Sequence, residues 1–170
     1  MKKIVLFMGL MFLGALANAG FYGTGLCGYP QYDCIKVEAG QTWDSLFPDP
    51  EKRDIVQRIN RTYNHLWAGK VIAVPKNLAY VNMFDVSPFP LKINDGRQKE
   101  IIVDQDKLAW AAYDAQGNLL RWGPISSGRD RCPDANRSCR TLTGIFRVFS
   151  KENEKCTSYV FPIGKGGAKM

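Results

Sequence analysis

The side chains of this chain that are best suited to chemistry are five cysteines and a single histidine, His65. A cysteine acts as a nucleophile when a neighbouring base or positive charge converts its thiol to a thiolate. No cysteine or serine stands close to His65 in the sequence, so we expect this histidine to be a loop residue without a catalytic role. Cys156 likewise has no histidine beside it, which favours a structural thiol.

Four of the cysteines form two pairs that are close in sequence, Cys27 with Cys34 and Cys132 with Cys139. Each pair can close a loop of about eight residues, and the chain-entropy model assigns such a closure roughly 2.5 kcal/mol of stability. A metal site is disfavoured, because neither pair has C-x-x-C spacing and His65 has no neighbouring ligand. The sequence therefore predicts two local disulfides, no metal and no cofactor, and leaves the partner of Cys156 open.

The N-terminal segment, residues 1–19, is typical of a secretory signal. Lys2 and Lys3 precede an apolar run from Ile4 to Leu16, and Ala17-Asn18-Ala19 is a small-residue cleavage site. The run would form a helix of about 20 Å, shorter than the bilayer hydrocarbon core of about 30 Å. We expect export to the periplasm or cell envelope, where disulfides persist, with no membrane span after cleavage.

The charge pattern bears on the partners. The chain has 23 basic and 16 acidic residues, a formal net charge of +7, and its basic residues are scattered. No basic run with interleaved aromatic residues is present, so a nucleic-acid partner is not expected. A mild positive excess suits a polyanionic cell wall, although an ordinary solvated basic surface explains it equally well.

Four mature segments differ in composition. Residues 20–33 are a turn-rich lead without helical or strand periodicity, and residues 34–77 are compact and periodic. Residues 78–98 contain Pro88 and Pro90 and read as a linker that packs on a neighbouring element. Residues 99–170 are rich in strand patterns. The order of elements predicts an α+β protein: a small βααβ unit followed by a mostly antiparallel β domain that is incomplete in this chain.

The βααβ unit (residues 34–77) has clear helix starts. Thr42 is a good N-cap for a short helix through Phe47, and Asp49 caps a second helix that has Pro50 at its first position. That helix should end between Asn60 and Asn64. Its apolar residues at 55, 56 and 59 predict one stripe facing a core. Short strands at 35–37 and 71–75 open and close the unit.

These segments resemble a LysM domain. Val37-Glu-Ala-Gly-Gln-Thr-Trp43 corresponds to its "V-x-x-G-D-T-L/W" opening, and Gly69-Lys-Val-Ile-Ala-Val-Pro75 to its "G-Q-x-L-x-I-P" ending. The resemblance implies binding of the N-acetylglucosamine units of peptidoglycan or chitin-like glycans in a groove between two loops. The implied glycan-binding residues are Gly40, Gln41, Thr42, Trp43, Tyr63, Asn64, His65 and Leu66. For Trp43, a place in the core is favoured over a role as a sugar platform.

The last segment has the alternating pattern of antiparallel strands. We predict strands at 100–103, 108–112, 119–122 and 144–149, with polar turns after the first two. Three short motifs of this segment resemble those of the L,D-transpeptidase (YkuD-type) catalytic domain: Ile102-Val-Asp104, Pro124-Ile-Ser-Ser-Gly128 and Thr141-Leu-Thr-Gly-Ile-Phe146. Domains of that family crosslink peptidoglycan through a cysteine nucleophile. That family's catalytic His and Ser-His-Gly-Cys motif would follow Met170, so no catalytic residue is assigned.

The resemblances imply a peptidoglycan-associated envelope protein of the L,D-transpeptidase family. We expect this chain to be catalytically inactive, because Cys-dependent acyl transfer needs the motif expected after Met170. The alternative is a non-catalytic protein that binds peptidoglycan through the LysM-like unit alone. The sequence leaves the oligomeric state, the glycan type and the stem-peptide specificity open.

Overall fold

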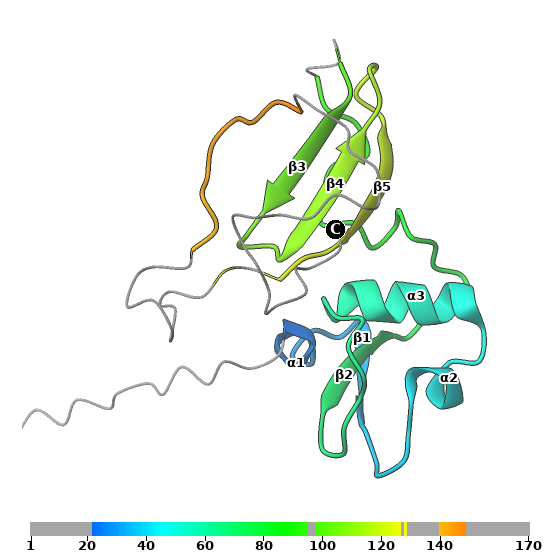
Figure 1. The fold of residues 1–170 in the computed structure, drawn as a ribbon. Helices are drawn as coiled ribbons and strands as arrows, with labels where there is room; N and C mark the ends of the chain where they lie inside the picture. The colour runs from blue at the N-terminus through cyan, green and yellow to red at the C-terminus, as the bar shows by residue number, and fades with distance from the viewer. Residues whose placement is uncertain (1–21, 95–97, 127, 129–139, 149–170) are drawn as a thin grey trace, which may run out of the picture. The chain divides into compact units, whose positions relative to one another are not determined.

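The computed structural model describes residues 22–94, 98–126, 128 and 140–148. Helices occur together with antiparallel sheets, so the predicted α+β class is confirmed. The chain divides into two compact units at residue 127. Among the described residues, no helix is long and apolar enough to cross a bilayer. The elements labelled in Figure 1 are α1 (Tyr22–Leu26), β1 (Tyr32–Lys36), α2 (Trp43–Leu46), α3 (Pro50–Ile59), β2 (Val71–Pro75), β3 (Glu100–Asp104), β4 (Ala109–Tyr113) and β5 (Leu119–Pro124).

The first sheet is the antiparallel pair β1–β2, in which Tyr32 lies opposite Pro75 and Lys36 opposite Val71. Strand β1 begins before the predicted residue 35, because its first residues pair with the end of β2. A disulfide joins Cys27 to the middle of β1 at Cys34, which confirms the first predicted pair.

Helices α2 and α3 begin at the side chains that the sequence indicated. The Thr42 hydroxyl accepts from the Ser45 N–H at 3.1 Å, and the Ser45 hydroxyl accepts from the Thr42 N–H at 2.8 Å. A carboxylate oxygen of Asp49 accepts two N–H groups of the first turn of α3, at 2.9 and 3.3 Å, and Pro50 follows it. Since the first N–H groups of a helix lack intrahelical partners, these acceptors set where each helix starts. The predicted end is confirmed too, with Asn60 at the C-cap.

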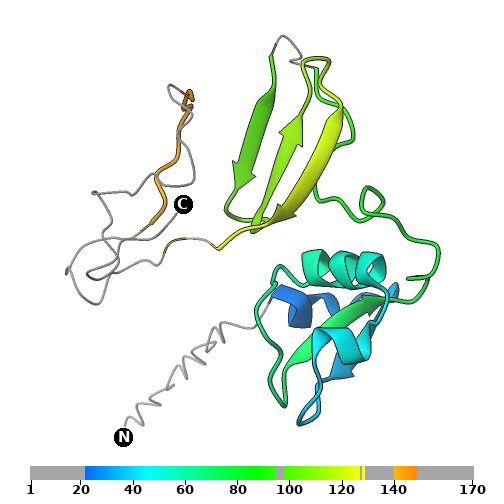
Figure 2. The same cartoon turned by 45° about the vertical axis from the view of Figure 1, so that its right-hand side comes forward.

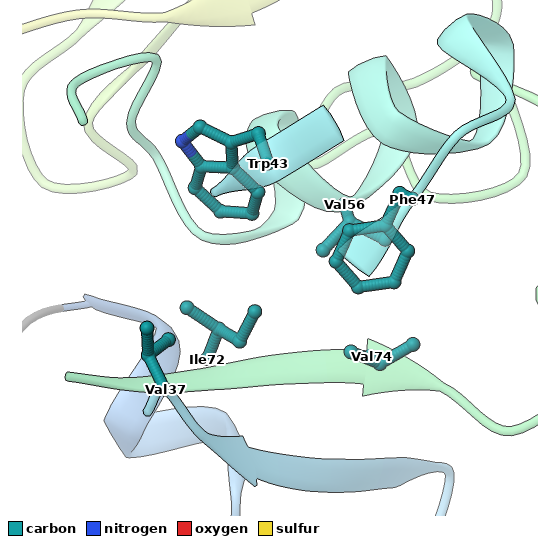
Figure 3. Close-up of a cluster of buried hydrophobic side chains, with 6 residues drawn as sticks. All are labelled: Val37, Trp43, Phe47, Val56, Ile72 and Val74. Carbon is teal, nitrogen blue, oxygen red and sulfur yellow. The ribbon is translucent and has the colours of Figure 1, made fainter. Parts of the chain in front are cut away.

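The main core of the βααβ unit lies between the β1–β2 sheet and the helices (Figure 3). None of its six members is more than 9 % exposed, and burying an apolar side chain of this kind stabilises by about 1.5–3 kcal/mol. The helical side contributes Trp43, Phe47 and Val56, and the sheet side contributes Val37, Ile72 and Val74.

Helix α3 is buried on two sides, so the prediction of one stripe facing one core is wrong. Val56 belongs to the main core, whereas Ile55 and Ile59 form a second cluster with Val81. Consecutive residues 55 and 56 lie about 100° apart around a helix, so both can be buried only when structure covers both sides. Residues outside the βααβ unit provide that second cover.

The prediction that residues 20–33 lack regular structure is wrong in two places, since α1 occupies Tyr22–Leu26 and β1 begins at Tyr32. A five-residue helix with two glycines is not stable by itself. Both Leu26 and Tyr32 pack against the cluster formed by Ile55 and Ile59. Tertiary contact, and not local propensity, therefore forms α1.

The second sheet has the antiparallel order β3–β4–β5, shown as three neighbouring arrows in Figure 2, and it confirms the first three predicted strands of this segment. One face is covered: Ala111, Tyr113 and Trp122 are at most 1 % exposed. The opposite face leaves Ile101 and Val103 exposed at 69 % and 54 %. The sheet therefore has one closed and one open face.

Four described residues of the segment 78–98, Met83, Val86, Phe89 and Ile93, pack on the closed face of this sheet, as predicted for the linker. Phe89 is 7 % exposed and belongs to the same cluster as Trp122. The Tyr113 hydroxyl donates to the carbonyl of Pro90 at 2.9 Å, and the Trp122 indole N–H donates to the carbonyl of Met83 at 2.6 Å. Pro88 and Pro90 prevent a regular helix or strand here, but the segment remains packed against the sheet.

Two arginines connect α3 and its C-terminal end to β5. Arg58 is 2 % exposed; its Nε donates to Asp54 at 2.6 Å, and its guanidinium lies 5.7 Å from the Trp122 ring centre. The guanidinium of Arg61 lies 4.5 Å from the ring centre of Tyr22 and 5.1 Å from that of Trp122. Burial lowers the pKa of Arg61, and the neighbouring Tyr22 opposes this shift. Cation–π contacts of this kind stabilise a charge that is removed from water.

The predicted strand at 144–149 is wrong for its described part. Residues 144–148 form no strand, and Ile145, Phe146 and Val148 are 99 %, 72 % and 78 % exposed. An alternating pattern can mark two faces, but a strand also needs a partner backbone for its hydrogen bonds. No such partner is present among the described residues.

Candidate functional site

Two loops of the βααβ unit meet beside one end of the β1–β2 sheet. The first loop (residues 38–42) joins β1 to α2, and the second loop (residues 61–70) joins α3 to β2. Val37 ties them together, because its N–H donates to the Lys70 carbonyl and its carbonyl accepts from the Gly69 N–H, both at 2.8 Å. Trp43 provides another tie through its indole N–H, which donates to the Asn64 carbonyl at 2.8 Å. The second loop is therefore held against the start of α2.

Each loop turns at a glycine with positive φ, 83° at Gly40 and 88° at Gly69. A Cβ added at either position would meet no atom within 4 Å, so the backbone conformation alone favours glycine. Gln41 closes the first turn, since its side-chain carbonyl accepts from the Glu38 N–H at 2.8 Å. The first loop is thus supported by its own hydrogen bonds.

The eight residues predicted to bind glycan differ in exposure. Trp43 is 6 % exposed and belongs to the main core, so its ring supports the loops from beneath and offers no surface to a ligand. Gln41 and Leu66 are partly buried, and Leu66 packs on the same core. The other five are exposed at the surface: Gly40, Thr42, Tyr63, Asn64 and His65.

Trp67 is an exposed aromatic residue of the second loop that the sequence reasoning missed. Its side chain is 46 % exposed, and the Lys70 ammonium lies 4.3 Å from its ring centre. Lys70 itself is only 3 % exposed, and burial lowers the pKa of its ammonium group. A cation against one face of the indole favours a fixed ring position. A tryptophan two residues before the loop glycine, in Trp67-Ala68-Gly69, was the available signal.

Tyr63 presents the second half-exposed aromatic ring of this loop, at 50 % exposure. Its hydroxyl donates to a carboxylate oxygen of Asp54 at 3.1 Å. Burial is the main cause of the raised pKa of Tyr63, and the charge of Asp54 contributes, so the phenol remains protonated at neutral pH. The hydrogen bond orients the ring at the start of the second loop.

The site combines flat apolar surfaces with hydrogen-bonding groups. Tyr63 and Trp67 provide the aromatic surfaces, and the other exposed residues of the two loops, Gly40, Thr42, Asn64 and His65, add polar side chains or backbone groups. Binding sites for small ligands usually combine aromatic side chains with a few well-placed polar groups. A ligand with apolar ring faces and amide or hydroxyl groups fits this combination.

The described residues offer neither a thiol nucleophile nor a metal site. The described cysteines, Cys27 and Cys34, are joined to each other, and no three His, Cys, Asp or Glu side chains gather in the described parts. His65 is exposed in the second loop. The predicted signal segment 1–19, the Cys132–Cys139 pair and Cys156 lie outside the described residues.

No family model matches the chain, and no curated protein or solved structure matches it either.

Proposed function

We propose that the βααβ unit binds an N-acetylated glycan, and that peptidoglycan is its ligand. The observation that carries this proposal is the tie between Trp43 and Asn64, which holds the second loop in place while Tyr63 and Trp67 stay half exposed. A sugar ring packs its C–H faces on aromatic side chains, and its N-acetyl group pairs with backbone N–H and carbonyl groups. Because the loops are ordered before binding, little conformational entropy is lost on association.

The setting of this activity is proposed to be the bacterial envelope. The Cys27–Cys34 disulfide is compatible with an oxidising compartment, and the signal-like segment 1–19 supports export. Without Lys2 and Lys3 of that segment the formal net charge is +5 (21 basic minus 16 acidic residues), a mild excess that suits contact with an anionic wall polymer.

Membership of the L,D-transpeptidase family is the wider part of the proposal. It is supported by the sequence motifs between residues 102 and 146. In this part of the chain, β3, β4 and β5 form an antiparallel sheet connected by hairpins. In this proposal the wall is bound through the LysM-like loops, and acyl transfer is not assigned to any described residue. A purely wall-binding protein is the alternative, and it predicts the same behaviour of the loops.

The test is retention of the full chain on insoluble peptidoglycan, together with titration by N-acetylglucosamine oligomers. We expect Trp67→Ala and Tyr63→Ala each to weaken binding about tenfold, equivalent to about 1.4 kcal/mol. Tyr80→Ala is the matched control, because Tyr80 is 89 % exposed and lies outside both loops. Circular dichroism should show unchanged folding for all three variants.

Salt separates specific binding from simple charge attraction. At about 1 M salt the Debye length falls to about 3 Å, which screens exposed charges. Glycan recognition by the two loops predicts retention at this salt concentration and competition by soluble oligomers. Loss of retention in salt, or equal retention of the Trp67→Ala variant, would contradict the proposal.

A further inference from the structure

Arg58 carries a buried donor without a partner. Its Nε donates to Asp54 at 2.6 Å, but its Nη1 atom is buried and has no hydrogen-bond acceptor among the described residues. A charged N–H group that is removed from water and left without an acceptor is costly, so such a group in a folded protein calls for an explanation. An acceptor that comes from outside the described residues would satisfy it.

The position next to this donor lies beside Gly123 on β5. A Cβ added at Gly123 would lie 2.9 Å from Trp110 Nε1 and 3.4 Å from Arg58 Nη1, so two N–H groups flank one point. The φ angle of Gly123 is not positive, and its backbone therefore does not require glycine. Glycine at this position instead leaves room for the two nitrogen atoms.

Arg121 adds a second guanidinium group on the same side of the sheet. Trp110 on β4 pairs with Gly123, and alternate residues of a strand face the same side. Arg121 stands two residues before Gly123, so it shares the open face with Trp110, and its side chain is exposed there. The open face of β4 and β5 therefore brings together donors and positive charge.

Tyr63 connects this position to the proposed glycan site. Its hydroxyl donates to one carboxylate oxygen of Asp54 at 3.1 Å, and the other oxygen accepts from Arg58. Burial is the main cause that raises the pKa of Tyr63, and the charges of Arg58 and Arg121 act in the opposite direction. The half-exposed ring of Tyr63 is therefore a neighbour of both guanidinium groups.

We propose that Arg58 Nη1 and Trp110 Nε1, with Arg121 beside them, bind a carboxylate group of the wall fragment whose sugar contacts Tyr63. Hydrogen bonds to a charged acceptor are strong, and a guanidinium group matches the plane and the charge of a carboxylate. The negative charge of Asp54 close by favours a ligand group with a single charge over a dianionic phosphate. This inference rests on the proposed function, because it extends the glycan surface from the second loop onto β5.

Trp110 borders the route by which the carboxylate enters. Arg58 Nη1 itself is buried, whereas the Trp110 side chain is only partly buried and lies on the open face. The incoming oxygen therefore reaches Nη1 beside the indole ring, whose N–H becomes its second donor. A neutral sugar without a carboxylate has no charged group to place there.

Calorimetric titration of the full chain compares soluble wall fragments that carry free carboxylates with the same fragments after conversion of the carboxylates to amides. We expect the free form to bind about tenfold more tightly, the effect of one hydrogen bond to a charged group. Arg121→Gln and Trp110→Phe should each bring this ratio close to one, because each removes a donor to the carboxylate. Lys76→Gln is the matched control. It removes the same charge from an exposed position after β2, at the end of the strand away from the two loops, and should keep the tenfold ratio.

A neutral oligomer of N-acetylglucosamine separates this inference from the proposed function. Binding of the oligomer, with equal affinity for the free and amidated fragments, would overturn the carboxylate site alone and would assign Nη1 to an ordered water molecule. No binding of the oligomer, with the free fragment still preferred, would contradict the glycan site and support the carboxylate site.

Two further results would also overturn the carboxylate site. A ratio that Lys76→Gln lowers as much as Arg121→Gln would assign the preference to overall charge. Stronger competition by inorganic phosphate than by acetate would assign the position to a phosphate group. Circular dichroism should show native secondary structure for every variant, and Arg121→Gln, at an exposed position, decides the test if Trp110→Phe does not fold.

Discussion

The β1–β2 pair and the β3–β5 sheet are both small antiparallel sheets, but their burial differs. From Ile72 to Pro75, every residue of β2 is buried, because α3 covers one side of the strand and α1 covers the other. In β3 no residue is fully buried, and Ile101 and Val103 face outward. The comparison shows that an apolar strand residue is not a core residue until a second layer covers it.

The largest expected effect contrasts the two faces of the three-stranded sheet. Trp122→Ala should lower the free energy of unfolding by about 3–5 kcal/mol, because it leaves a large cavity and removes the indole hydrogen bond to Met83. Ile101→Ala, on the open face, should change it by less than about 0.5 kcal/mol. Urea unfolding followed by circular dichroism measures both, and similar losses would show that the open face is covered in solution.

The next effect concerns the polar link between α3 and β2. The Asn60 amide donates to the carbonyls of Val56 and Ala73 at 2.8 and 2.7 Å, and accepts from the Ala73 N–H at 2.8 Å. Asn60→Ala leaves buried backbone groups without partners, so we expect a loss of about 2–3 kcal/mol. Asn77→Ala is the control at an exposed position. Equal thermal unfolding midpoints of the two variants would contradict this role.

A smaller effect is expected at the start of α2, which carries the first loop. Thr42→Ala removes the acceptor of the Ser45 N–H and should cost about 1 kcal/mol, whereas Thr42→Ser keeps a hydroxyl and should cost less. Glycan binding should weaken only in proportion to the fraction unfolded. A large loss of binding in a fully folded Thr42→Ala variant would instead indicate direct ligand contact.

The smallest effect is pH-dependent and lies in the β3–β4 turn. The hydrogen bond from Lys107 is the main cause that holds the pKa of Asp104 below its usual value of 3.8. A carboxylate with a lowered folded-state pKa stabilises above the unfolded pKa, and this contribution is lost as the pH falls through the folded pKa. Since Lys107 is partly exposed, we expect less than about 1 kcal/mol.

The check compares the unaltered chain with Asp104→Asn in urea. The difference in unfolding free energy should be present at neutral pH and should shrink progressively below about pH 4. A difference that is equal at neutral and strongly acidic pH would mean that the turn geometry, and not the charge, supplies the stability.

Local sequence by itself determined the helix starts at Thr42 and Asp49, the turns at Gly40 and Gly69, and the first three strands of the second sheet. At the helix starts one side chain accepts nearby N–H groups, and at the turns one positive φ favours glycine, so distant residues do not alter these features. The three strands are consecutive along the chain and pair with their sequence neighbours. The Cys27–Cys34 pair belongs here too, because its loop is short.

The sequence favoured a core position for Trp43, which is confirmed, but only the tertiary structure showed that Trp67 is exposed on the second loop. Trp43 and Trp67 both lie in or beside loops, yet Trp43 enters the core while Trp67 rests against Lys70 at the surface. Tertiary structure also formed α1, and among the described residues it provides no strand partner for residues 144–148. Burial and strand pairing depend on residues that are distant in the sequence, and a local sequence pattern does not identify those residues.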